Sequence, residues 1–177
     1  MKFDYSEKSF TLVELLVVIS IISILSGLAL ANYRGGDRRY ALSRSAYKLS
    51  QDIRRAQEMS MSAKEFSGSV PFGYGVYFKN DASNKTHYIL FADKNGNQLY
   101  DPTVDGIVED IPLGKRVEIG NFSPNLSSLT IVFTPPDPSV TINGGSASSA
   151  SITLWLQNNH SKIETIKVNK AGLIAVE

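Results

Sequence analysis

The sequence predicts an α+β protein in which a long N-terminal helix precedes an antiparallel β-sheet domain. Three observations support this: an uncharged apolar run over Leu15–Ala31, a helical-period apolar stripe that continues toward residue 64, and short β-like runs after Gly73. We therefore expect the β-rich domain, residues 67–177, to pack on the second half of the helix, residues 33–66.

The first apolar run is long enough to cross a membrane. No charged residue occurs between Glu14 and Arg34. At 1.5 Å rise per helical residue, such a run approaches the ~30 Å hydrocarbon thickness of a bilayer. Glu14 lies just inside the run, where an ionisable group costs about 2.5–3.5 kcal/mol on insertion scales. We therefore assign a transmembrane segment over residues 10–32 and expect Glu14 to have a partner.

The helical pattern continues beyond this run as a narrow apolar stripe on a polar helix. The stripe consists of Leu42, Ala46, Leu49, Ile53, Ala56 and Ala63. On the polar face, Arg54 is spaced to pair with Glu58, and Asp52 with Arg55. Gly68 and Pro71 predict that the helix, which begins near Thr11, ends at about Lys64.

A pair of glycines interrupts the predicted helix. In a helix interior Gly35 and Gly36 each cost about 1 kcal/mol relative to alanine. We interpret them as a hinge, and a complete break into two helices is the alternative.

The C-terminal part has the residue pattern of an antiparallel sheet. Short runs rich in Val, Ile, Tyr and Phe alternate with Gly, Asn, Asp and Pro. The proline-rich segment 134–138 predicts a loop, and the Gly/Ser-rich segment 143–149 a flexible connection. The predicted strands are Tyr74–Phe78, His87–Ala92, Arg116–Phe122, Leu129–Phe133, Ser151–Gln157, Glu164–Val168 and Leu173–Val176.

Composition limits the function classes. The 177 residues carry 18 basic and 17 acidic side chains, a net charge of +1, and no cysteine. This excludes thiolate metal sites and gives no overall attraction to nucleic acid. A local basic group nevertheless follows the apolar run. We interpret it as a contact with other subunits or with lipid headgroups, and DNA binding is the less favoured alternative; the group is Arg34, Arg38, Arg39, Arg44 and Lys48.

Residue patterns typical of catalysis are absent from the sequence. His87 and His160 lie far apart without a metalloprotease or nucleophile-elbow spacing, so we predict that the protein is not an enzyme and has no cofactor.

One loop resembles the first half of a calcium-binding loop, with oxygen ligands at Asp93, Asn95, Asn97 and Asp101. Its glycine and its final carboxylate are misplaced for such a loop. The favoured interpretation is a polar turn whose side chains cap backbone amides.

The segment Ser9-Phe10-Thr11-Leu12-Val13-Glu14-Leu15 resembles the N-terminal signature of type IV prepilins and type II secretion pseudopilins. The resemblance implies that residues 1–9 are a leader and that a prepilin peptidase cuts between Ser9 and Phe10 and methylates the Phe10 amine. Ser9 stands where the family usually has glycine. The resemblance also implies that Glu14 pairs with the Phe10 amine of a neighbouring subunit in a filament.

The remainder of the chain is similar to the minor pseudopilin H of type II secretion and to related minor pilins. This similarity rests on the segment from Asp52 to Gln57 and on a closing strand after Ala171-Gly172. It implies the pilin fold, an inner-membrane location with an exported C-terminal domain, and a filament outside the cytoplasm. The implied partners are the peptidase, other pilin-like subunits, and an inner-membrane assembly platform with its ATPase.

Two alternatives remain open. Ala29-Leu30-Ala31 is a site that signal peptidase could cut, which would release a soluble domain. The apolar segment could also be a plain anchor for an exported β-rich binding domain. Counting Lys and Arg on each side of the span would place the large domain in the cytoplasm. The leader motif requires the opposite orientation, with the N-terminus in the cytoplasm.

Overall fold

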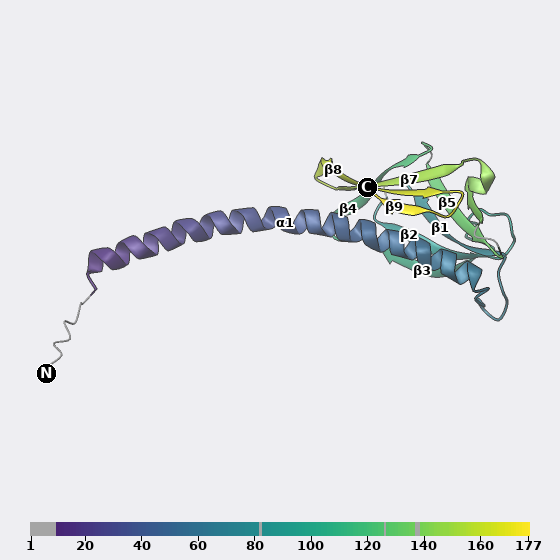
Figure 1. The fold of residues 1–177 in the computed structure, drawn as a ribbon, viewed down its shortest axis with the longest axis horizontal. Helices are drawn as coiled ribbons and strands as arrows, with labels where there is room; N and C mark the ends of the chain where they lie inside the picture. The colour runs from purple at the N-terminus through teal and green to yellow at the C-terminus, as the bar shows by residue number, and fades with distance from the viewer. Residues whose placement is uncertain (1–9, 82, 126, 137–138) are drawn as a thin grey trace. The chain divides into compact units, whose positions relative to one another are not determined.

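The computed structural model describes residues 10–81, 83–125, 127–136 and 139–177, and at residues 31–38 it describes the backbone alone. The predicted leader with Ser9, part of the 134–138 loop, and the side chains of Arg34 and Arg38 lie outside these residues. The chain forms two units, Met1–Asp37 and Arg38–Glu177. The second unit therefore contains the outer half of the helix together with all the strands (Figure 1).

The N-terminal element is a single 50-residue helix, α1, over Leu12–Met61. Its backbone is helical through Gly35-Gly36, so the alternative of two separate helices is wrong. The boundary between the two units lies directly after these glycines, at Asp37 and Arg38.

The strands form two antiparallel sheets where the sequence had suggested one. The five-stranded sheet has the order β3-β2-β1-β5-β6, and the four-stranded sheet the order β4-β7-β8-β9. The strands are β1 Gly73–Lys79, β2 His87–Asp93, β3 Gly106–Pro112, β4 Val117–Ser123, β5 Ser128–Thr134, β6 Ser139–Ile142, β7 Ser149–Leu156, β8 Asn159–Asn169 and β9 Ile174–Val176. The antiparallel α+β prediction is confirmed.

The core of the second unit lies between the outer half of α1 and the inner faces of both sheets (Figure 1). The predicted helix stripe is buried from Leu42 to Ala56. The two alanines of this part, Ala46 and Ala56, are fully buried, and their small side chains let the helix approach the strands closely. The sheets contribute large side chains such as Phe78 and Tyr88.

The end of α1 differs from the prediction. Ala63 is exposed and lies beyond the helix, with a φ of 46°. The Ala63 N–H donates to the Ser60 carbonyl and the Lys64 N–H to the Met59 carbonyl, which is a Schellman motif. This motif, and not Gly68 or Pro71, ends the helix. Met59 and Ser60 instead complete the buried stripe.

The predicted pairs on the polar face are also wrong, because these side chains reach the sheets. The Tyr88 hydroxyl donates to Asp52 Oδ2 at 2.6 Å, and Arg55 pairs with Glu109 of β3 at 2.6 Å. Arg54 donates to the Ile174 carbonyl of β9. These three side chains therefore bond the helix to β2 and β3 of the five-stranded sheet and to β9 of the four-stranded sheet.

Two strands were not predicted, β3 and β6. Both lie at the edges of the five-stranded sheet. β3 has two consecutive acidic residues, Glu109 and Asp110, on exposed positions, and β6 has only four residues. An edge strand can be short and can carry consecutive charged residues in place of alternating apolar and polar ones. The sequence pattern that identifies a strand is therefore weak in β3 and β6.

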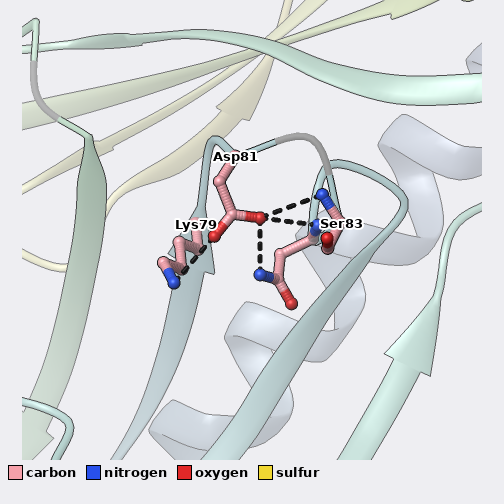
Figure 2. A network of polar contacts seen from close by, with 4 residues as sticks. Lys79, Asp81 and Ser83 are labelled. Carbon is pink, nitrogen blue, oxygen red and sulfur yellow. Dashed lines mark hydrogen bonds and ion pairs between the residues drawn. The ribbon is translucent and has the colours of Figure 1, made fainter.

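The connection from β1 to β2 is closed by one carboxylate (Figure 2). Asp81 pairs with Lys79 at 2.7 Å and accepts hydrogen bonds from the backbone N–H groups of Ser83 and Asn84. The hydrogen bond from Lys79, together with those from Asn84, lowers the pKa of Asp81 to about 2. This is an Asx-type turn with a surface ion pair, and its role is to hold the shape of the connection between β1 and β2.

Candidate membrane and assembly site

The first turn of α1 has a side-chain cap that the sequence analysis missed. The Glu14 N–H donates to Thr11 Oγ1 at 3.2 Å, and the Leu15 N–H donates to the Thr11 carbonyl at 3.1 Å. Thr11 is therefore the N-cap, and Glu14 occupies the third helical position, as in a capping box. The spacing Thr-x-x-Glu before an apolar run is the signal that could have revealed it.

The position of Glu14 gives its carboxylate a local role besides the predicted assembly role. A carboxylate in the first turn interacts favourably with the positive end of the helix dipole. This interaction is worth about 0.3–1 kcal/mol, less than the cost of placing a carboxylate in hydrocarbon.

The helix that follows has no apolar partner among the described residues of the chain. The segment Leu12–Leu30 is 19 residues long, and none of it is buried. The hydroxyls of Ser20 and Ser23 donate to the carbonyls of Leu16 and Ile19, one helical turn earlier. Because these polar groups are already bonded within the helix, the segment can enter hydrocarbon at little further cost.

A helix that is apolar on every side requires a partner outside its own chain. Phe10 and Glu14 lie at the exposed start of this helix. The arrangement can bury apolar surface in lipid or against other helices, while Glu14 offers a negative charge at a fixed position. The apolar span and its N-terminal signature indicate a membrane-anchored protein with an exported domain.

The structure brings the predicted calcium ligands into one loop, between β2 and β3. Asp93 is buried and accepts hydrogen bonds from the N–H groups of Gly96 and Gln98. Asn95 and Asn97 each accept from the backbone two residues later, as Asp101 does from Thr103. The geometry is that of the polar turn that we favoured.

Asp105 also organises this loop. It is buried, and its two oxygens accept hydrogen bonds from the N–H groups of Lys94 and Asp101. Burial raises the pKa of Asp93, with a further contribution from the charge of Asp105, against the lowering effect of the backbone hydrogen bonds. The described residues contain no group of three or more His, Cys, Asp or Glu arranged for a metal. Calcium binding stays the less favoured alternative to the polar turn.

The two histidines lie apart, as predicted. His87 opens β2, whereas His160 stacks on Trp155 with ring centroids 4.4 Å apart. The Trp155 indole donates to Glu118 Oε1 at 2.8 Å and lies over Gly120, where an added Cβ would meet the ring at 2.5 Å. The indole thus contacts residues of β4 and β8, and the cluster joins the β7–β8 hairpin to β4.

Comparisons with known proteins agree with the N-terminal signature and with the fold. Residues 5–30 match the family described as the prokaryotic N-terminal methylation motif. The chain is 29% identical over 132 residues to the pilin-like protein PilA1 of Thermus thermophilus, covering 73% of this chain and 78% of that protein.

A solved structure, the type IV minor pilin FimU of Pseudomonas aeruginosa, has the same fold. The TM-score is 0.53 with 10% identity, covering 78% of this chain and 90% of that one. The methylation motif, the pilin-like relative and the shared fold together support the predicted resemblance to pilin-like structural subunits.

Proposed function

We propose that this chain is made as an inner-membrane precursor, is cut between Ser9 and Phe10, and is then N-methylated at Phe10. The peptidase would act on the cytoplasmic side, and the subunit would later be drawn into a filament by an assembly platform and its ATPase. The protein works by assembling and not by catalysis.

The observation that carries this proposal is the pairing of an uncovered apolar helix with a single carboxylate at its start. Leu12–Leu30 has no buried residue, and Glu14 lies in its first turn. In a membrane the Glu14 charge is unfavourable, while in a bundle of such helices it can meet the Phe10 ammonium of a neighbour. Assembly would therefore relieve both the apolar exposure and the charge.

The processing step can be tested by the intact mass of the membrane-bound protein. We expect a chain that begins at N-methylated Phe10. A chain that begins at Asn32 would mean that signal peptidase uses Ala29-Leu30-Ala31, and the filament proposal would then be abandoned.

The assembly step can be tested with two substitutions of Glu14. Glu14→Ala removes both the charge and the polar side chain, whereas Glu14→Gln removes the charge and keeps a side chain of the kind that can complete a capping box. If the charge drives assembly, both variants should be lost from sheared filaments, since an unpaired Phe10 ammonium in the helix core costs roughly 3–5 kcal/mol. Both should still be cleaved and should reach the membrane.

The contrast between the two variants identifies which role matters. Normal assembly of Glu14→Gln with failure of Glu14→Ala would assign Glu14 to helix capping alone. Normal assembly of both would favour the alternative of an anchored binding domain.

The type of filament, secretion pseudopilus or type IV pilus, is best assigned by which secretion or retraction components the subunit copurifies with.

A further inference from the structure

A groove of about 610 Å³ lies at the N-terminal end of the second unit, between α1 and the outer end of β8. It exists because β9 is short. β9 pairs only with Ile166–Val168, so the outer end of β8, residues 159–164, has β7 on one side and extends past β9 on the other. The groove is lined by Arg39, Tyr40 and Ser43 from the helix and by Ser161, Lys162 and Ile163 from β8.

The groove combines exposed cations with exposed apolar side chains. Arg39 and Lys162 are exposed, and next to them Tyr40 is 71% and Ile163 is 55% exposed. Glu164 is the one carboxylate lining the groove, against two cations. Within the part of the chain that the structure describes, neither Arg39 nor Lys162 forms an ion pair.

More cations surround the groove at the same end of the unit. Arg44 and Lys48 are exposed on the next turns of α1. The loop before β4 is tied to this part of the helix, since the Gly114 N–H donates to Ser45 Oγ at 3.1 Å. That loop carries the exposed residues Lys115 and Arg116. This end of the unit is therefore positively charged.

The groove begins only a short way along the chain from the membrane span. Arg39 follows Leu30, the last residue of the span, by nine positions, all of them helical in α1. That length of helix measures about 13 Å, and the headgroup layer on each side of a bilayer is about 5–8 Å thick. The chain between the span and the groove is therefore short enough for the groove to reach the bilayer surface.

The side chains of the groove suit such a surface. Tyrosine is enriched at membrane–water interfaces, and Lys and Arg near a membrane are attracted to anionic lipids. Duplex DNA would use the cations equally well, but it has no use for the exposed apolar side chain of Ile163, which a lipid surface can bury. We infer that this groove docks onto the phosphate headgroups of anionic lipids in the membrane that holds the span. The inference rests on the proposed membrane insertion but not on processing or assembly.

The test uses the full chain in lipid nanodiscs. Because the protein has no cysteine, Asn158→Cys in the β7–β8 turn provides a single position for a spin label beside the groove. The measured quantity is the ratio of the immobilised to the mobile component of the spectrum. In discs with phosphatidylglycerol we expect this ratio to be at least tenfold higher than in discs of phosphatidylcholine alone, and to fall with added salt.

The double variant Arg39→Gln/Lys162→Gln should lower the ratio toward its value in phosphatidylcholine, by up to about 25-fold, since each cation near an anionic surface is worth about fivefold. The matched control, Lys64→Gln/Lys170→Gln, removes the same charge from exposed positions past the far ends of α1 and β8 and should not change it. Circular dichroism of each variant checks that the unit is folded.

Three results would overturn the inference. The first is an equal ratio in the two kinds of disc, and the second is an equal effect of the two double variants. The third is a ratio that does not rise with phosphatidylglycerol but does rise when duplex DNA is added to phosphatidylcholine discs. The last result would assign the groove to nucleic acid. A labelled chain that inserts, is cleaved and assembles normally while failing this test would leave the proposed function intact. A chain that does not insert at all would contradict both.

Discussion

The two halves of α1 belong to one helix but bury their apolar side chains in different surroundings. From Leu12 to Leu30 the helix is apolar on all sides, and none of it is buried within the chain. From Leu42 to Ala56 it carries a single apolar stripe, and that stripe is buried against the two sheets. A helix with one apolar stripe can be satisfied by its own domain, whereas a helix that is apolar all round needs lipid or other subunits.

The largest expected effect separates the two halves directly. Ile53→Ala removes a fully buried side chain and should lower the free energy of unfolding of the second unit by about 2–5 kcal/mol. The matched control is Ile22→Ala, which makes the same change where the side chain is exposed. It should leave unfolding unchanged, as followed by the fluorescence of the single tryptophan in detergent. An equal loss in both variants would contradict the comparison.

A second substitution tests how α1 is bonded to the sheets. Tyr88→Phe removes the hydrogen bond to Asp52 and should cost roughly 1–3 kcal/mol at neutral pH. Burial, followed by the hydrogen bond to Asp52, raises the pKa of Tyr88 above its ordinary value of 10.0. The stabilisation from this shift is complete below pH 10 and is lost as the pH rises beyond it, because the unfolded chain then releases the proton first.

The stability of the wild type should therefore fall above pH 10 more steeply than that of Tyr88→Phe. Urea unfolding at neutral pH and near pH 10.5 measures both slopes. Parallel slopes in the two proteins would mean that Tyr88 is not shielded by the contact between helix and sheet. Since burial also raises the pKa of Tyr74 and Tyr100, the variant should keep part of the dependence.

A smaller effect is expected at the end of α1. Ala63 adopts a positive φ of 46° in the Schellman motif, a conformation that costs a non-glycine residue about 1–2 kcal/mol. Ala63→Gly should therefore stabilise the second unit by on the order of 1 kcal/mol, part of which is offset by the greater freedom of glycine in the unfolded chain. Thermal unfolding measures the shift. As a control, Ala56→Gly inside the helix should be destabilising.

The smallest expected effect concerns calcium. The oxygens of Asp93 and Asp105 already accept backbone hydrogen bonds that close their loop. We therefore expect millimolar calcium or a chelator to leave the melting temperature unchanged, whereas Asp93→Ala should cost about 1–3 kcal/mol. A clear rise of the melting temperature with calcium, abolished by Asp101→Asn, would show that the loop binds the ion. The stability of the second unit would then also depend on a ligand from outside the chain.

The sequence by itself determined the features that depend on local pattern. The span, the buried stripe of α1 and seven of the nine strands follow from periodicity and composition, which act within a few residues. The signature from Phe10 to Glu14 predicted the family for the same reason. The cap at Thr11 could also have been found, because its spacing to Glu14 is local.

Only the tertiary structure decided which distant groups meet. Pairing of Asp52 with Tyr88 and of Arg55 with Glu109 depends on where α1 crosses the sheets, and the sequence favoured local pairs along the helix. The division into two sheets, the edge strands β3 and β6, and the groove beside β8 depend on strand order and on where each strand ends. Such contacts join residues far apart in the chain, so no pattern in a short window of sequence encodes them.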